Sequence, residues 1–312
     1  MPRVDAVAAL LNGPRASGAF LLRSVLRAPW SMRIADRAPL TVLAVLRGSA
    51  WVLLADGRSE QLGTGAVALL RGPEPYTVAD DPGTAPQVAI GPGQVCTPLG
   101  SPAMAGLGTR SWGNDPDGET VLVTGTYTAP GAVGERLVRA LPPLVVVPPD
   151  DGAGAVTGLL ATEMGRDAPG QEAVLDRLLD VTLVSALRSW AARPGAGAPG
   201  WYLAHGDPVV GPALRLVHER PAEPWTVGSL ADAVGVSRAT LARRFTELVG
   251  EPPMSYLTGW RIALAADLLA DPALTVSGIA RRVGYASPFA LSTAFKRVTG
   301  VSPATHRRSV SA

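Results

Sequence analysis

Two stretches near the C-terminal end of the sequence carry side chains of the types that contact nucleic acid. In residues 238–249, Leu241 and Phe245 recur at helical spacing and should pack inward, which leaves Arg243 on the opposite face. An outward arginine on a helix can donate two hydrogen bonds to a guanine edge in the major groove. Residues 287–299 repeat this pattern. We therefore expect both stretches to be DNA-reading helices.

The candidate DNA-contacting residues are of two kinds. Outward side chains in the first half of each helix could reach base edges, whereas the flanking basic side chains could bind phosphate, which positions a protein without specifying sequence. Phe289 would suit a thymine methyl group, or it could cap a local apolar cluster. The candidates are Arg238, Ala239, Ala242, Arg243 and Arg244 in the first stretch and Ser287, Phe289, Ser292, Thr293, Lys296 and Arg297 in the second.

Each of these stretches is the second half of a repeated unit, which spans residues 226–250 and 275–300. A short apolar helix, a glycine turn and a second helix form a helix-turn-helix, which lays its second helix in the major groove. A long helix expected at 253–270 would join the two units. The repeat therefore predicts a monomer that touches two successive major-groove segments. The equivalent pairs are Leu230/Ile279, Ala231/Ala280, Val234/Val283, Gly235/Gly284, Leu241/Leu291, Phe245/Phe295, Gly250/Gly300 and Pro253/Pro303.

The distribution of charge agrees with DNA contact by the C-terminal part. From Pro212 onward the chain holds 12 Lys and Arg against 7 Asp and Glu, whereas the whole chain has a net charge of only +2. A basic domain on a mildly acidic remainder is typical of nucleic-acid binding. Neither a signal peptide nor a run long enough to span a membrane is evident, so we expect a cytoplasmic protein without membrane contact.

The first part of the chain should be rich in β-structure. Short apolar runs are broken by glycine and proline, and Ala55-Asp56-Gly57-Arg58 is a hairpin signal. This pattern predicts a sandwich or a small barrel. We expect a helix at residues 1–12 and a long irregular loop at 91–119. The expected strands are 18–26, 40–47, 49–55, 67–71, 75–79, 86–90 and 120–128.

Helices are expected in the middle of the chain and throughout its C-terminal part. Residues 151–165 and 169–191 are amphipathic, and this pair could close the first domain or form a dimer interface. Residues 191–200 have the composition of a linker. The other expected helices are 130–141, 208–219, 226–234, 238–249, 253–270, 275–283 and 287–299.

The β-rich part lacks the residues of the common catalytic and metal sites. All three histidines follow residue 204, so imidazole ligands for iron, manganese or zinc are missing there. No grouping of serine, histidine and aspartate occurs, and we expect neither an enzyme nor a bound metal or other cofactor. A barrel of this size could instead hold a small molecule or be filled by its own side chains. The candidate ligand-binding residues are Trp30, Arg47, Trp51, Tyr76 and Trp112.

Cys96 offers a second way of sensing. It is the only cysteine, so an internal disulfide is impossible, and oxidation would have to join it to another molecule. A reactive thiol needs a nearby cation, and no cationic residue adjoins Cys96 in the sequence. We therefore prefer an idle cysteine and keep a redox sensor as an alternative.

Residues 208–308 resemble the DNA-binding domain of the AraC/XylS family of transcription regulators. The segment Ile279–His306 carries the family signature, including Gly284-Tyr285, Phe295-Lys296, Gly300 and Pro303. The resemblance implies seven helices, two helix-turn-helix units joined by a long helix, and binding to promoter DNA. Pro288 and Phe289 depart from the polar residues that members often carry, which affects the expected base preference of the second unit.

Residues 1–145 resemble the cupin-like sensor domain that precedes the DNA-binding domain in many such regulators. The resemblance implies an α+β multidomain chain: a jelly-roll barrel at 1–145, a helical linker or dimerisation segment at 146–206, and an all-α double helix-turn-helix domain at 207–312. Tyr76 stands where the family often has histidine. The matching segments are Leu46–Gly48, Leu62–Gly65, Val67–Leu70, Arg71–Tyr76, Trp112–Gly118 and Leu122–Gly125.

These observations predict a sequence-specific regulator whose binding to promoter DNA is controlled by a small-molecule effector in the cupin-like domain. The protein could also form a homodimer, and RNA polymerase would be a further partner if the protein is an activator. One alternative is a redox-sensing regulator that acts through Cys96. Another is a constitutive DNA-binding protein whose barrel only dimerises. A metal-dependent cupin enzyme is disfavoured because its histidine ligands are missing.

Overall fold

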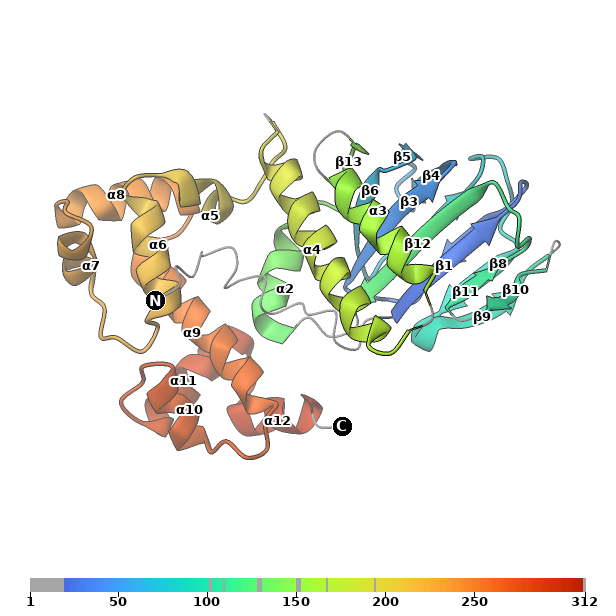
Figure 1. Ribbon diagram of the computed structural model, residues 1–312. Helices are drawn as coiled ribbons and strands as arrows, with labels where there is room; N and C mark the ends of the chain where they lie inside the picture. Colours follow the sequence, from blue (N-terminus) through green and yellow to red (C-terminus); the bar gives the residue numbers. More distant parts are fainter. Residues whose placement is uncertain are drawn as a thin grey trace. The chain divides into compact units, whose positions relative to one another are not determined.

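The computed structural model describes two compact units (Figure 1). The first unit contains the β-sheets and lies within residues 15–129 and 141–196. The second unit includes residues 130–140 and 197–312, and its described part is helical. The helix expected at 1–12 lies outside the described residues. These residues are 20–100, 103–108, 110–127, 131–149, 153–166, 168–193 and 195–310.

The strands of the first unit form two sheets. All neighbours are antiparallel except the pairs β1–β11 and β2–β8. In spatial order, the first sheet contains β10 (Ala105–Gly108), β11 (Ser111–Gly113), β1 (Phe20–Leu26), β12 (Thr120–Tyr127), β3 (Leu40–Arg47), β6 (Val67–Arg71) and β13 (Leu144–Val147). The second contains β5 (Ser59–Gly63), β4 (Ser49–Leu54), β7 (Tyr76–Ala79), β2 (Ser31–Ile34), β8 (Val88–Gly91) and β9 (Val95–Pro98).

The two sheets share one apolar core. Leu43 of β3, Val78 of β7 and Leu122 of β12 belong to the same buried cluster. This cluster joins side chains from alternate positions of strands in both sheets, as expected where two sheets pack face to face. The sheet-rich first domain and the helical second domain confirm the fold class expected from the sequence.

Two helices cover the first sheet, α3 (Ala153–Met164) and α4 (Gln171–Ala191) (Figure 1). Leu179 of α4 packs directly on Gly125 of β12, where an added Cβ would lie 2.4 Å from the leucine side chain. A glycine at this strand position therefore lets the helix approach the sheet. The pair of amphipathic helices closes the sheet domain, which was one of the two roles expected for it.

The prediction of an irregular loop at 91–119 was wrong. This segment contains a short 3-10 helix, Pro92–Gln94, and the strands β9, β10 and β11. Both β9 and β10 end a sheet, and their side chains are mostly exposed. They therefore lack the alternation of apolar and polar residues by which a half-buried strand is recognised. The short strands β2 and β5 were not expected either.

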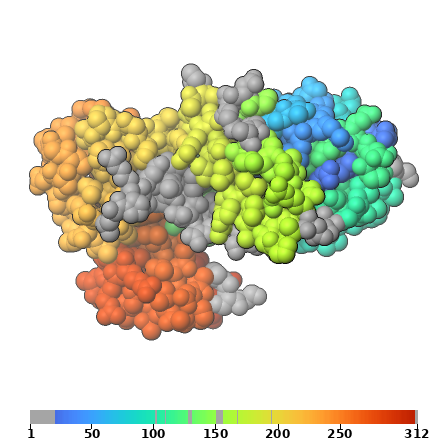
Figure 2. Space-filling model, viewed as in Figure 1, coloured from blue at the N-terminus to red at the C-terminus, as the bar shows by residue number. Residues whose placement is uncertain are grey.

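In its described part, the helical unit contains the seven helices that the family resemblance implies, α6 to α12, together with α2 and α5. Figure 2 shows the residues from α10 onward gathered in one compact orange-red lobe. Among the described residues the helices are α2 (Gly131–Ala140), α5 (Gly200–Leu203), α6 (Val210–Glu219), α7 (Val227–Ala233), α8 (Arg238–Val249), α9 (Pro253–Leu269), α10 (Val276–Arg282), α11 (Pro288–Thr299) and α12 (Pro303–Val310), with a 3-10 turn at Ala204–Gly206.

The long helix α9 contributes to two separate cores. Tyr256, Leu257 and Trp260 pack with α6, α7 and α8. Ile262 and Leu269 pack with α10 and α11. Each helix-turn-helix therefore has its own core, and α9 fixes the two units in one rigid frame. No described helix is both long and apolar enough to cross a membrane.

Candidate nucleic-acid interface

The two helices expected to read DNA, α8 and α11, each begin at a serine cap. The Ser237 hydroxyl accepts the Thr240 amide at 3.1 Å, and the Ser287 hydroxyl accepts the Ala290 amide at 3.1 Å. A side-chain oxygen at this position satisfies one of the free amides of the first turn. The preceding turns contain Gly235 and Gly284, with φ of 74° and 81°. The structural repeat therefore extends to the turns and caps that orient α8 and α11.

The first reading helix, α8, presents Arg243 to solvent. Its guanidinium pairs with Glu247 one turn later, with Nη1 at 3.0 Å from a carboxylate oxygen, and both side chains are more than half exposed. An exposed pair of this kind contributes little free energy and can be exchanged for a contact with DNA. Arg238 and Ala239 are also exposed, whereas Ala242 is half-buried.

Arg244 has a different environment from its neighbour. Its Nε and Nη2 atoms donate to Asp207 Oδ2 at 2.9 and 2.7 Å. The other oxygen of Asp207 accepts the amides of Val209 and Val210 at the start of α6. These hydrogen bonds hold the pKa of Asp207 below its usual range, although burial of the carboxylate acts in the opposite direction. Arg244 thus ties α8 to α6 and is engaged within the protein.

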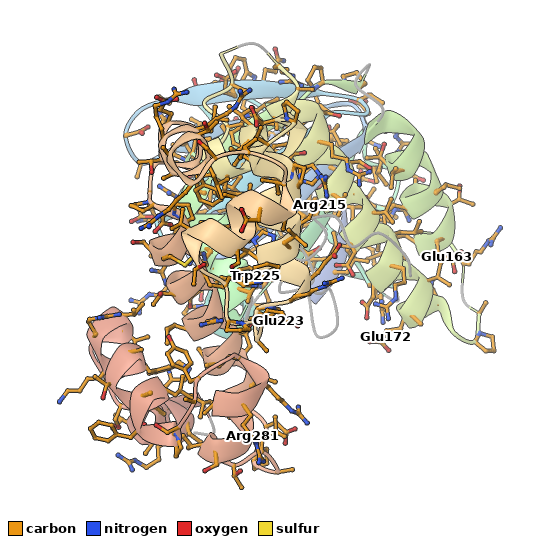
Figure 3. The ribbon with its side chains drawn as sticks, turned by 90° about the vertical axis from the view of Figure 1, so that its left-hand side faces the viewer. Glu163, Glu172, Arg215, Glu223, Trp225 and Arg281 are labelled. Atoms are coloured by element: carbon orange, nitrogen blue, oxygen red, sulfur yellow. The ribbon has the colours of Figure 1, made fainter. Side chains whose placement is uncertain are left out.

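The second reading helix, α11, exposes an apolar side chain at its start. Phe289 is 80% exposed, directly after the Pro288 that occupies the first helical position. Thr293, Lys296 and Arg297 are exposed as well. The hydroxyl of Ser292 donates to the Pro288 carbonyl at 2.8 Å, and Ser287 is the helix cap. Figure 3 shows that Arg281 of the preceding helix also reaches the outside of this unit.

A loop before α7 braces the second helix-turn-helix. Arg261 of α9 donates to the carbonyls of Pro221 and Glu223, both at 2.7 Å, and its guanidinium carbon lies 5.8 Å from the Tyr285 ring centre. A Cβ on Gly284 would lie 2.8 Å from the backbone of Ala222. Figure 3 shows Glu223 in this loop. The signature pair Gly284-Tyr285 therefore serves to hold the two units in register, a task that the sequence alone did not reveal.

Helix α2 docks on α9, although its sequence lies between β12 and β13 of the sheet domain. Val133 is 3% exposed and belongs to the core of the first helix-turn-helix. Asp267 of α9 accepts the amides of Ala132 and Val133 at 2.5 and 3.3 Å. Burial raises the pKa of Asp267, although these two hydrogen bonds act in the opposite direction. A segment embedded in the cupin-like sequence thus completes the helical unit.

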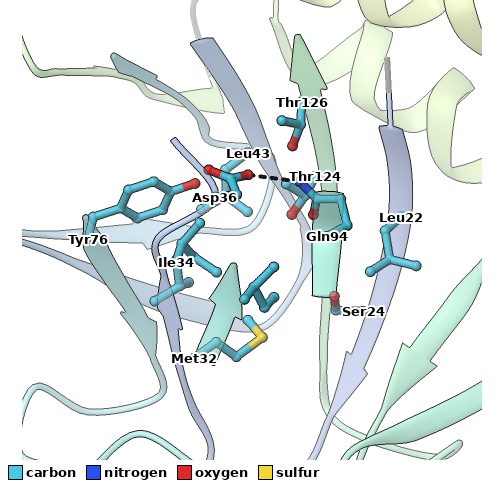
Figure 4. Close-up of a pocket in the computed structure, with 12 residues that line it drawn as sticks. Leu22, Ser24, Met32, Ile34, Asp36, Leu43, Tyr76, Gln94, Thr124 and Thr126 are labelled. Carbon is cyan, nitrogen blue, oxygen red and sulfur yellow. Dashed lines mark hydrogen bonds between the residues drawn. The ribbon is translucent and has the colours of Figure 1, made fainter. Parts of the chain in front are cut away.

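The sheet domain holds a small cavity of about 30 Å³, room for one or two waters (Figure 4). Tyr76 and Asp36 point toward one another in this cavity, and Gln94 donates to the Asp36 carboxylate at 2.9 Å. Burial raises the pKa of the Tyr76 phenol. The other polar residues of the wall are Ser24, Thr124 and Thr126. These residues interrupt otherwise apolar strands. Thr124 and Thr126 follow Leu122 at every second position, so the sequence itself indicates that they share a face with the core.

The five candidate ligand-binding residues do not gather around this cavity. Tyr76 lines it, whereas Trp30 is fully buried in the core. Arg47 donates to the carbonyls of Gly118 and Glu119. Trp51 lies on β4 between Ala50 and Val52 of the core and so faces the other side of that strand. Trp112 is half-buried against the core.

The remaining chemical candidate is Cys96 on the edge strand β9. Cys96 is an exposed residue, and desolvation raises the pKa of its thiol, whereas an activated cysteine has a lowered pKa. Across the described ranges, no three histidine, cysteine, aspartate or glutamate side chains cluster as metal ligands do.

Comparison with known proteins matches both units to described families. A family model described as Cupin matches residues 5–192, and a Helix-turn-helix domain model matches residues 230–309. A "Putative AraC-like transcription regulator" of Streptomyces lividans is 35% identical over 285 residues, 89% of this chain and 90% of the relative. One of Streptomyces antibioticus is 37% identical over 271 residues, 85% and 86% of the two chains. The structure of the AdpA DNA-binding domain with a target DNA is 35% identical and covers 33% of this chain and 93% of its own, with a TM-score of 0.32.

Proposed function

The chain belongs to the AraC-type family of transcription regulators, and we propose that it binds two successive major-groove segments of promoter DNA with α8 and α11. The observation that carries this proposal is the duplicated helix-turn-helix on a shared α9, with equivalent caps and turns in both copies. Members of the family are sequence-specific DNA-binding proteins, and the positions of the contacts on α8 and α11 are our proposal.

The base-reading residues that we propose are Arg243 and Ala239 on α8 and Phe289 and Thr293 on α11. All four are exposed. Arg243 supplies the donors that guanine requires, and Phe289 supplies an apolar contact for a thymine methyl group. Phe289 is 80% exposed at the start of α11, so its ring is accessible for such a contact. Arg238, Lys296 and Arg297 would then contact phosphates.

The second element of the proposal is a small-molecule effector in the cavity of the cupin domain. The polar side chains of Asp36, Tyr76 and Gln94 converge in a cavity that apolar side chains such as Leu22, Met32 and Ile90 also line, as in many ligand sites. A cavity of about 30 Å³ is too small for a metabolite. Binding must therefore enlarge the space between the sheets, and that displacement is the structural signal.

Helix α2 provides a route for this signal. The chain leaves β12 at Tyr127, forms α2 against α9, and returns at Leu144 of β13. A displacement of β12 or β13 therefore acts on a helix that contributes to the core of the DNA-binding unit. An effector changes the fraction of molecules with α2 docked on α9 only if its affinities for the docked and undocked states differ.

Fluorescence anisotropy with the protein's own upstream promoter region tests the proposal. We expect tighter binding to this DNA than to random DNA of equal length at the same salt concentration, because base contacts add to the phosphate contacts that both share. Equal affinity for the two would contradict sequence-specific regulation.

A dimer is the alternative role of the cupin domain, and one observation favours it. Leu159 of α3 and Val174 and Val181 of α4 are 60%, 44% and 48% exposed. Val174 and Val181 are two turns apart on one face of α4, which suits a helical interface with a second copy. Sedimentation of the full chain with and without Val181→Asp distinguishes a dimer through α4 from a monomer.

A further inference from the structure

The helical unit contains a pocket of about 660 Å³, far larger than the cavity in the cupin domain. Its walls come from three parts of the unit: α2, α9, and the segment from the end of α11 to α12. Pockets of this size hold metabolite-sized ligands. The residues that give it chemical character are Arg136 and Arg139 of α2, Tyr256 and Ile262 of α9, and Val301 and His306 at the far wall.

Arg136 is the polar centre of this pocket. Its side chain is only 29% exposed, and its guanidinium carbon lies 5.2 Å from the ring centre of Tyr256. Its nearest carboxylate, Glu251, is 3.8 Å away, too far for a hydrogen bond. Among the described residues, no acceptor within hydrogen-bonding distance meets any of its five donors. By contrast, Arg261 and Arg307 of the same unit each donate to two carbonyls.

A glycine on α9 makes room for this guanidinium. A Cβ on Gly259 would lie 2.6 Å from Arg136 Nη1. Glycine in the interior of a helix is unfavourable, so its presence indicates that another group approaches closely. Arg136 therefore lies against α9 among the residues that line the pocket, with most of its side chain shielded from solvent.

The acidic groups around the pocket are already engaged. Glu135 pairs with Arg139 on the same helix, and Asp267 accepts the first amides of α2. His306 stands at the opposite wall, with its ring 5.4 Å from that of Phe295. Ile262 of α9 and Val301 beside His306 add apolar side chains to the lining. The surroundings thus combine an available planar cation with an apolar surface.

We propose that this pocket binds an apolar monocarboxylate, whose carboxylate accepts two hydrogen bonds from Arg136 and whose body lies on Ile262 and Val301. The planar guanidinium fork matches a carboxylate better than any other common anion except phosphate. Because α2, α9 and the segment from the end of α11 to α12 all line the pocket, a ligand in it contacts α2 together with the rest of the unit and stabilises the docked position of α2. This site is separate from the cavity of the cupin domain and does not depend on an effector there.

Isothermal titration of the full chain with 4-phenylbutanoate and with 4-phenylbutanol at neutral pH tests the proposal. The two probes share an apolar body and differ in the acid group. We expect saturable binding of the acid, at least about tenfold tighter than that of the alcohol, because a hydrogen-bonded ion pair adds free energy that the alcohol cannot gain. Absence of saturable acid binding up to millimolar concentration, or equal affinity for the two probes, would overturn it.

Substitutions in and outside the pocket show where the probes bind. Arg136→Gln should weaken binding of the acid by about tenfold and leave binding of the alcohol unchanged. Arg215→Gln, on α6 and outside the pocket lining, should change neither affinity by more than about twofold. Val301→Trp fills the pocket from a position that is 39% exposed, so the fold should survive while both probes are excluded. Tyr76→Phe in the cupin domain should have no effect. Acid binding that persists in both Arg136→Gln and Val301→Trp would show that the probe binds elsewhere.

Discussion

At the scale of single residues, neighbouring arginines on α8 have opposite roles. Arg243 is exposed and pairs only with Glu247 of its own helix, whereas Arg244 is tied to Asp207 near α6. Helical periodicity placed Arg243 on the outward face of α8, whereas Arg244 was expected from its charge to contact phosphate. The sequence could not predict the partner of Arg244, since Asp207 lies 37 residues earlier and only the packing of α6 on α8 brings it there.

Substituting each arginine in turn distinguishes a role in DNA affinity from a role in the stability of the fold. Arg243→Ala should weaken binding to the promoter by roughly 5- to 150-fold, about 1–3 kcal/mol, because the guanine contact is lost. Stability should hardly change, because the exposed pair with Glu247 contributes little free energy. Arg244→Ala should lower the free energy of unfolding, because it leaves Asp207 with an unpaired charge. Anisotropy and urea unfolding of both variants check this. A loss of stability in Arg243→Ala with no loss of DNA affinity would contradict the assignment.

His218 makes the stability of the helical unit depend on pH. Its Nε2 lies 2.8 Å from the Tyr256 hydroxyl, and burial, with the charge of Arg136 as a smaller cause, lowers its pKa to about 3. In the unfolded chain the His218 imidazole takes up a proton near pH 6.5, whereas in the folded protein it stays neutral until the pH approaches 3. The contribution to stability is therefore complete above pH 6.5 and is lost as the pH falls from 6.5 toward 3.

Urea unfolding at pH 7 and pH 5 checks this contribution. The midpoint should fall at pH 5 in the native protein, and His218→Gln should reduce this dependence while lowering stability at pH 7. His306→Gln is the matched control for the loss of an imidazole, because that half-buried ring packs against Phe295 and makes no side-chain hydrogen bond among the described residues. An unchanged dependence in His218→Gln would refute the explanation.

At the scale of elements, the sequence predicted most helices of the second unit and the longer strands of the first. Serine caps, glycine turns and apolar periodicity are local signals, and they determined the bounds of α8, α9 and α11 within about one residue. The strands β9, β10 and β11 depend on pairing with distant strands and carry no such signal. The docking of α2 on α9 was likewise invisible, since an amphipathic helix does not reveal which surface it covers.

Asp267 tests that docking. Its raised pKa means that the folded state favours the protonated form, so its contribution to stability is largest at low pH and falls as the pH rises through the folded value. Asp267→Asn keeps an acceptor for the α2 amides without a buried charge, and stability at pH 7 should be equal or higher. Asp267→Ala removes the acceptor and should cost on the order of 1–3 kcal/mol in urea unfolding. Equal stability of Asp267→Ala and the native protein would show that α2 is not held by this contact.

At the scale of the whole molecule, the order of domains and the class of function followed from the sequence, because the signature Ile279–His306 and the internal repeat are specific. The ligand sites did not follow. Aromatic residues such as Trp30 and Trp51 attract attention in a sequence, yet they lie in the core or on the outer side of a strand, while smaller polar residues line the cavity. The sequence does not mark Arg136 as a binding residue, because the pocket around it forms only when α2 packs on α9.

Hydroxyl-radical footprinting of the full chain on its own promoter tests the central claim most directly. If α8 and α11 occupy successive major-groove segments, one bound protein should protect two patches on the same face of the duplex, about 10 base pairs apart from centre to centre. Arg243→Ala should weaken protection in one patch and Phe289→Ala in the other. A single protected patch, or two patches that both respond only to Arg243→Ala, would contradict the account.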